Sequence, residues 1–366
     1  MNLEISGNGK ILQEELKLDN NCSFSSVCNF EELNRGDLIK IKLKLSGDSL
    51  ESPHTIPFEN YILKSDDNNS KLDITFLNMY LKSIKEVYYY SYEMIFRAES
   101  IIWGNNEKIT RLEFSIPNLI IGYDDMKISD KIINYTNFEL KFRNKNYKIQ
   151  LEGNSDFNDS FTNISAQTNF TSKIKIESDS ELNYDDCIDL ANNLNNLISI
   201  AYGSVRPHLM IEGFLDDILV YKKLEQKRYS DSSEANNLIN IKYSSILSDF
   251  IIKYFDSFSK LEENTKLALI KLIYDFSNMS KIINKESFTL FVYMIEDFYT
   301  HFYKQKQTFI ISFKTILEKY NVEYDYKKIE YLELNMNKPY LYQDYAILYE
   351  NISYFKKFII SFLNSI

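Results

Sequence analysis

The sequence predicts an α+β protein of two domains, a β-rich domain followed by an all-helical domain. Two observations support this class. Residues that form turns are confined to the first part of the chain, since every Gly lies at or before Gly213 and every Pro but one lies at or before Pro207. Apolar residues alternate with a period of two in that part, and after about Asn236 they recur at helical spacing.

The change in pattern places the domain boundaries. We expect a β-rich domain at residues 1–215, a linker at 216–236 and a helical domain at 237–366. A chain of 366 residues is long enough for two apolar cores. Basic residues of the expected linker, Lys222, Lys223, Lys227 and Arg228, alternate with carboxylates, and this pattern favours a solvated face over a phosphate contact.

Strands are predicted where apolar and polar residues alternate. One hairpin is expected at Asn137–Leu151, with its turn after Phe142, and a second pair of strands is expected on the two sides of Gly104. Shorter strands are expected at Leu38–Leu45, Tyr61–Leu63, Leu72–Phe76 and Ser172–Glu177. Several short strands at this spacing predict a β-sandwich or a bent barrel.

One helix interrupts the β-rich domain. Asn183 is a suitable N-cap, and Gly203 is a suitable stop. Between them apolar residues repeat at intervals of three and four, at Cys187, Leu190, Ala191, Leu194, Leu197, Ile198 and Ala201. We expect this helix to pack its apolar stripe on the sheet.

The last 130 residues predict a compact helical bundle. Each expected helix carries a wide apolar stripe, and the expected bounds are Ile239–Phe258, Thr265–Met279, Ser287–Lys304, Thr308–Tyr320 and Gln343–Asn364. The aromatic face of the last helix, formed by Tyr354, Phe355, Phe358, Ile359 and Phe362, fits either an interface or the core, and core packing is the more common use.

Composition excludes several classes of protein. A net charge of −10 argues against sequence-independent binding of nucleic acid, which depends on clustered Lys and Arg. No apolar run approaches the length of a membrane span, and no signal segment is visible, so we expect a cytoplasmic protein. The scattered cysteines Cys22, Cys28 and Cys187 suit reduced thiols, and neither a metal nor a cofactor is expected.

Two short motifs have alternative interpretations. The segment Ser6–Lys10 is similar to a phosphate loop, but Ile11 replaces the hydroxyl residue that would hold magnesium, so an Asn-Gly hairpin turn is the preferred interpretation. The aromatic segment Tyr88–Tyr92 could stack on bases. In a strand, however, half of those rings would enter the core.

The best candidate for acid and base chemistry is on one predicted helix. Asp297 and His301 are four residues apart and therefore share a face, and Glu296 is adjacent. The spacing fits a metal ligand pair or an acid and base pair. The surrounding sequence is mostly apolar, which favours a structural His that bonds to a neighbouring helix.

Three segments carry a resemblance to a known family. They are Tyr92–Tyr123, Glu181–Gly203 and the helical Phe288–Phe298, with Glu296 at an acidic position. In their order and hydrophobic pattern they resemble the ApeA family of bacterial antiphage proteins, which join an N-terminal β domain to a C-terminal HEPN domain. The resemblance implies a HEPN-like helical domain and a role in abortive infection.

Members of that family that cleave RNA use an Arg and a His four to six residues apart. The last Arg of this chain is Arg228, so the helical half cannot supply that pair. The segment at the corresponding position is Leu334–Tyr342, in which only Asn337 matches the family pattern. Lys338 is a poor substitute for Arg, because an ammonium group lacks the two-pronged fit of guanidinium to phosphate.

Two functional hypotheses rest on the helical half, and a third is a sensor whose β half binds a phage protein. In the first, the chain is a defence protein with a degenerate HEPN domain that engages RNA such as tRNA, pairs as a homodimer, or binds another protein partner. In the second, it is an active metal-independent ribonuclease. The catalytic set would then be His301 as base, Glu296 or Asp297 to orient it, and Asn337 with Lys338 at the phosphate.

Overall fold

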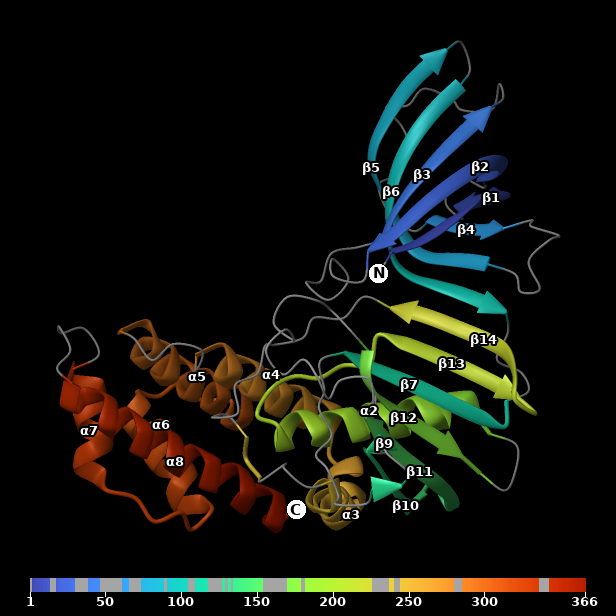
Figure 1. Cartoon of the computed structure of the whole chain (residues 1–366). Helices are drawn as coiled ribbons and strands as arrows, with labels where there is room; N and C mark the ends of the chain where they lie inside the picture. Colours follow the sequence, from blue (N-terminus) through green and yellow to red (C-terminus); the bar gives the residue numbers. More distant parts are fainter. Residues whose placement is uncertain are drawn as a thin grey trace.

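The computed structural model describes most of the chain, in ranges separated by gaps. The described residues are 2–13, 18–29, 39–46, 61–65, 74–88, 91–104, 109–117, 127–128, 131–132, 134–153, 170–178, 182–225, 237–239, 244–279, 285–335 and 342–366. Strands, with one helix among them, occupy the described residues up to Glu225, and helices occupy those after it, which confirms the mixed α+β class (Figure 1).

Twelve of the strands belong to one antiparallel sheet. Its order is β10-β11-β12-β7-β13-β14-β6-β3-β2-β1-β4-β5, and β5 also pairs with β6. The bounds are β1 Asn2–Gln13, β2 Leu18–Asn29, β3 Ile39–Ser46, β4 Tyr61–Ser65, β5 Ile74–Tyr88, β6 Ser91–Gly104, β7 Arg111–Pro117, β10 Asn134–Phe142, β11 Lys145–Gly153, β12 Phe170–Glu177, β13 Met210–Leu215 and β14 Ile218–Glu225. The short strands β8, Lys127–Ile128, and β9, Lys131–Ile132, pair with each other.

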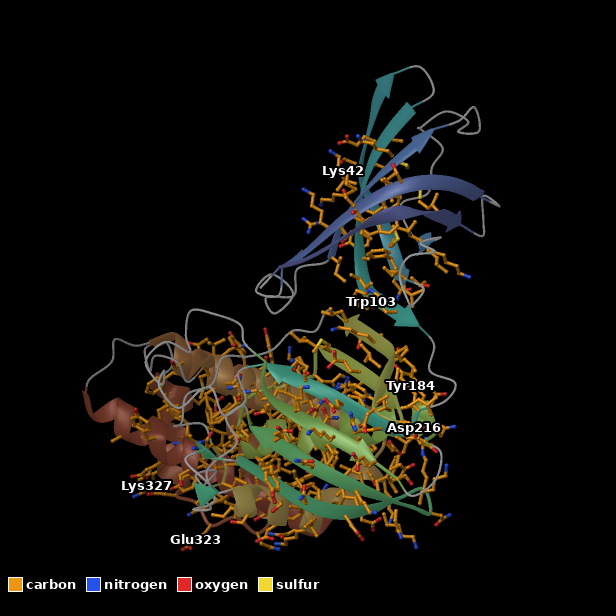
Figure 2. All side chains as sticks on the ribbon, turned by 45° about the vertical axis from the view of Figure 1, so that its right-hand side comes forward. Lys42, Trp103, Tyr184, Asp216, Glu323 and Lys327 are labelled. Atoms are coloured by element: carbon orange, nitrogen blue, oxygen red, sulfur yellow. The ribbon has the colours of Figure 1, made fainter. Side chains whose placement is uncertain are left out.

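The first six strands form a closed barrel, which we call the strand ring. Strand β6 pairs with β3 along residues 91–98 and with β5 along its other edge, and β2, β1 and β4 complete the circuit. The interior of the ring is filled by apolar side chains, among them Ile41, Leu43, Phe76 and Phe96. Charged residues such as Lys42 lie outside, where Lys42 pairs with Glu93 at 3.0 Å (Figure 2).

The remaining six strands extend from the ring as an open sheet. Strand β14 pairs with the last residues of β6, so that Trp103 lies where the ring and the open sheet meet (Figure 2). One face of the open sheet packs on the helix α2, Tyr184–Ala201 (Figure 1). The seven α2 residues expected to form its apolar stripe are all buried, which confirms the predicted face.

The predicted start of α2 is also confirmed. The Asn183 side chain accepts a hydrogen bond from the Asp186 backbone N–H at 2.9 Å, as an N-cap does. Gly203 follows the helix with φ 56°, a conformation that glycine adopts without steric cost. The helix therefore begins and ends where its capping residues predict.

In the part of the chain that the structure describes, six helices follow the sheet. Their bounds are α3 Ser244–Ser259, α4 Glu263–Met279, α5 Lys285–Tyr303, α6 Phe309–Lys319, α7 Tyr326–Asn335 and α8 Tyr342–Ser365. Five correspond to predicted helices, and α7 was not predicted because its sequence is polar with few apolar positions. A single apolar cluster runs from the open sheet through α2 into all six helices, so the second core is shared between strands and helices.

Three details of the strands differ from the expectation. Segment Ser6–Lys10 is neither a phosphate loop nor a turn, because it lies inside the long strand β1, paired with β2. The strands on the two sides of Gly104 do not pair with each other, since the hairpin β13–β14 lies between β6 and β7. Strand β14 occupies Ile218–Glu225, inside the range expected to be a linker. The division into two domains stays a prediction.

The reason for the second difference is sheet geometry. Strand β7 pairs with β13 from Arg111 to Ser115, and β14 pairs with the last residues of β6, Ser100–Gly104. The β13–β14 hairpin therefore lies between β6 and β7, which are consecutive in sequence. Local alternation predicts that a segment is a strand, but it cannot predict which strand lies beside it. Residues Tyr89 and Tyr90 of the aromatic segment lie outside the described residues, between the ends of β5 and β6.

Candidate functional site

The sequence-predicted acid and base residues lie on α5, which packs beside α4 (Figure 1). Asp297 and His301 face the seam between these two helices, and Glu296 lines the larger hollow of the seam and also contacts the start of α6. Side chains of α4 and α5 form the two walls of this seam. We call it the α4–α5 groove and define it by Leu267, Lys271 and Asp275 on α4 and Leu290, Tyr293, Asp297 and His301 on α5.

The α4–α5 groove is hollowed and partly apolar. It holds a cavity of about 670 Å³ that continues into a smaller one of about 100 Å³, which share Lys271 and Asp297. Three large apolar side chains stand exposed along it, Leu267 at 64%, Leu290 at 47% and Tyr293 at 56%. Apolar groups that are contiguous and left in water are typical of a binding surface.

Lys271 ties the two walls of the groove together. Its ammonium group donates to Asp275 on its own helix at 3.2 Å and to Asp297 across the groove. Burial tends to lower the pKa of Lys271, but the hydrogen bonds to these two carboxylates outweigh it and raise the pKa. Lys271 therefore stays charged, and Asp297 is held by Lys271.

Glu296 has a structural partner at the start of α6. The backbone N–H of Phe309 donates to its carboxylate, and the backbone N–H of Ile310 donates to Glu333 of α7 at 3.2 Å. The N-cap residue of α6, Thr308, makes no side-chain capping bond. Two carboxylates from neighbouring helices thus satisfy N–H groups that the helix itself leaves open, at the end where its dipole favours negative charge.

The environment of Glu296 disfavours its charged form. Burial raises the pKa of Glu296, the hydrogen bond from Phe309 opposes that rise, and repulsion from Glu333 adds to it, so the pKa lies above its usual value. A carboxyl group with a raised pKa in the folded chain stabilises the fold below its unfolded pKa. That contribution is lost as the pH rises through the folded value.

We therefore expect Glu296→Gln to gain stability relative to the wild type as the pH rises. The amide oxygen still accepts from Phe309, but it carries no charge to be desolvated or repelled. Urea unfolding of both proteins at pH 4.5 and at pH 7.5 measures this, and the difference in unfolding free energy should favour the variant more at pH 7.5. The matched control is Glu323→Gln at an exposed site (Figure 2). An unchanged difference between the two pH values would contradict the role of Glu296.

The predicted catalytic residues are not brought together among the described residues. His301 is exposed at the end of the groove, and no hydrogen bond or ion pair joins it to Asp297 or Glu296 in the part of the chain that the structure describes. Asn337 and Lys338 lie outside the described residues, as does Arg228. Arg206 is buried after α2, where its Nε donates to Ser204 Oγ at 3.1 Å, and it does not line the groove.

The aromatic face of the last helix belongs to the core. Phe355, Phe358, Ile359 and Phe362 are all buried, and Tyr354 is half-buried with its hydroxyl accepting from the backbone N–H of Asp325 at 3.3 Å. This confirms the more common of the two uses expected for such a stripe. Exposed apolar side chains of α4 and α5, Leu267, Leu290 and Tyr293, lie along the α4–α5 groove. The pattern could not distinguish them, because Leu267 and Leu290 adjoin residues of the buried stripes.

Among the described residues, no three His, Cys, Asp or Glu side chains are grouped in a way that could hold a metal ion. Cys22 and Cys187 are buried in separate cores, and burial raises the pKa of the Cys187 thiol to about 12, so this thiol is protonated and unreactive. None of the helices that the structure describes carries an apolar stretch sufficient to cross a membrane.

Comparison with known proteins gives one family match. The family model of the YopA central domain matches residues 104–235, about a third of the chain. No curated protein and no solved structure matches. The matched range includes the open sheet and α2 and ends before α3, so it supports similarity to the YopA central domain and is not specific to the ApeA or HEPN families. In residues 104–235, this chain is similar to the YopA central domain.

Proposed function

We propose that this chain is an antiphage defence protein of two domains that acts as a dimer, and that its helical domain is a degenerate HEPN-like domain that does not cleave RNA. The observation that carries the dimer is the α4–α5 groove, where exposed Leu267, Leu290 and Tyr293 border a hollow. The defence role rests on the resemblance of Tyr92–Tyr123 and Glu181–Gly203 to ApeA-like proteins.

Charge in the groove favours a second copy of the chain as the partner. The groove places Lys271 between the carboxylates of Asp275 and Asp297, so each copy offers both signs of charge. A two-fold axis brings the same surface of both copies together, and each Lys271 can then reach the carboxylates of its counterpart. The apolar side chains fill the centre, and the ion pairs form the rim.

The carboxylates of Asp297 and Glu296 both have structural partners, which supports a helical domain that does not cleave RNA. Asp297 is paired with Lys271, and Glu296 accepts the Phe309 N–H at the start of α6. Neither is left to orient His301 as a general base. The helical half also contains no Arg to meet a phosphate with two hydrogen bonds.

Analytical ultracentrifugation of the purified full chain tests the dimer. We expect the wild type to sediment as a dimer at micromolar concentrations and Leu290→Glu to sediment as a monomer, because a carboxylate buried without a partner opposes association. The matched control is Leu334→Glu, an exposed Leu on α7 outside the groove, which should remain a dimer. A monomeric wild type would exclude pairing through this surface.

A plaque assay tests the defence role with the same proteins. Cells that produce the wild type or His301→Ala should resist phage, and cells that produce Leu290→Glu should not. Loss of protection in His301→Ala, with the dimer intact, would favour the ribonuclease hypothesis instead. Equal susceptibility of cells with and without the wild-type chain, over a range of phages, would refute the defence role.

A further inference from the structure

A second hollow lies on a different part of the molecule. It is enclosed by the β10–β11 turn, by α2, and by the junction of α3 with α4, and its volume is about 790 Å³. This is larger than the hollows of the α4–α5 groove and falls within the range of small-molecule sites, roughly 300–1,000 Å³. We call it the α2 cleft, defined by Lys141, Arg143, Asn192, Asn196 and Lys266.

One wall of the α2 cleft is a stripe of polar side chains on α2. Asp189, Asn192, Asn193 and Asn196 are three or four residues apart and form a polar stripe on α2, next to its buried apolar residues. Asn144 adds a fourth amide from the turn of the hairpin. Each amide presents both a donor and an acceptor, the combination that reads the edge of a base.

The cleft gathers cations in an acidic protein. Its lining carries four cationic side chains, Lys141, Arg143, Lys260 and Lys266, and three acidic ones, Asp189, Asp256 and Glu263. Asp186 beside the lining also pairs with Arg143, so the charges balance, 4 − 4 = 0, whereas the whole chain carries −10. Lys141 and Lys266 are the cations that this arrangement offers to an anion.

Lys266 is the central group of the cleft. Its side chain is only 6% exposed, and its ammonium group donates to the Ser259 carbonyl at 3.1 Å and to Glu263 at 2.8 Å. An ammonium group has three donors, and the third has no acceptor among the described residues. A buried ammonium with one open donor on the wall of a cleft can receive an anionic oxygen.

The acidic residues do not block this use. Glu263 is exposed, and so are Asp256 and its partner Lys260, which lie 2.5 Å apart. Exposed ion pairs of this kind are worth about 0–1 kcal/mol, so a more highly charged ligand can displace them. Arg143 is held more firmly, because it pairs with both Asp186, at 2.6 Å, and Asp189, at 2.5 Å. Lys141 has no ion-pair partner in the described part of the chain.

From these observations we propose that the α2 cleft binds a nucleoside phosphate. The phosphates contact Lys266 and Lys141, and the amides of α2 and Asn144 contact the base. The ligand bridges the segment that is similar to the YopA central domain and the helices after it, because the cleft is built from both. This inference does not depend on the dimer.

Isothermal titration of the full chain with ATP, without added metal, tests the proposal. We expect one ATP per chain, weaker binding of AMP and tripolyphosphate, and no binding of adenosine. Lys266→Met and Lys141→Ala should each weaken ATP binding by about tenfold, the effect of one lost charge-assisted contact. Lys40→Ala, an equal loss of charge at an exposed site on the strand ring, should change it less than about twofold.

Each other outcome contradicts the proposal. Absence of ATP binding up to millimolar concentrations would overturn it, and so would equal affinities for the wild type and Lys141→Ala. If tripolyphosphate bound as tightly as ATP, the base would contribute nothing to binding, and a nucleoside phosphate would not be the ligand. Lys141 is exposed, so its substitution keeps the test valid if Lys266→Met does not fold.

Discussion

Replacing Phe291 by Ala should lower the free energy of unfolding by about 3–5 kcal/mol, the usual cost of truncating a fully buried Phe. Phe291 of α5 is completely buried. Its ring lies edge-on to Phe313 at 5.6 Å and Phe309 at 6.0 Å, both of α6, and to Phe355 of α8 at 6.3 Å. The truncation leaves a cavity where three helices meet, and the rings around it can relax only partly.

Urea unfolding followed by circular dichroism measures this effect. The matched control is Ile311→Ala, which removes an apolar side chain from an exposed position of the neighbouring helix α6, outside the α4–α5 groove. It should change the free energy of unfolding by no more than about 0.5 kcal/mol. If both variants lost the same stability, the burial of Phe291 between α5, α6 and α8 would not be the source of the loss.

Replacing Gly213 by Ala should destabilise the fold by about 1–3 kcal/mol, the range for overpacking a filled core. A Cβ at position 213 would lie 2.9 Å from Ile109 Cδ1 and 3.1 Å from Tyr221 Cβ. Gly213 pairs with Tyr221 of β14 and with Leu112 of β7, so it lies between two neighbouring strands and cannot move away freely.

A double-mutant cycle shows whether the close contact is the cause. Ile109→Val removes Cδ1, the atom nearest to the new Cβ, and should recover part of the stability that Gly213→Ala loses. The coupling free energy should be of the order of 0.5–3 kcal/mol, as found for residues in contact. Strictly additive effects in urea unfolding would mean that the Ile109 contact is not the source of the loss.

The helices are predicted well because their signals are local. Asn183 caps α2 through a bond to the backbone three residues later, and the stripe from Cys187 to Ala201 is buried as its spacing predicts. Helix α7 was missed because its polar sequence has little amphipathic pattern. Its place is set by burial of Ile329 and Leu332 against other helices.

The candidate site was predicted only in part. Sequence spacing placed Asp297 and His301 on one face of a helix, and both line the α4–α5 groove. The pairing of Asp297 with Lys271 joins residues 26 positions apart, and the contact of Glu296 with Phe309 joins two different helices. The α2 cleft brings together residues from the hairpin, α2 and the α3–α4 junction.

The sequence by itself determined the class of the fold, the position of most helices and strands, the hairpin β10–β11 and the lack of Arg in the helical half. Only the tertiary structure decided which strands are neighbours, that six of them close into a ring, and that one core joins the open sheet to the helices. The physical reason is range. Periodicity and capping act over one or two turns, whereas strand pairing, groove walls and the partner of each buried charge depend on segments that meet only when the whole chain packs.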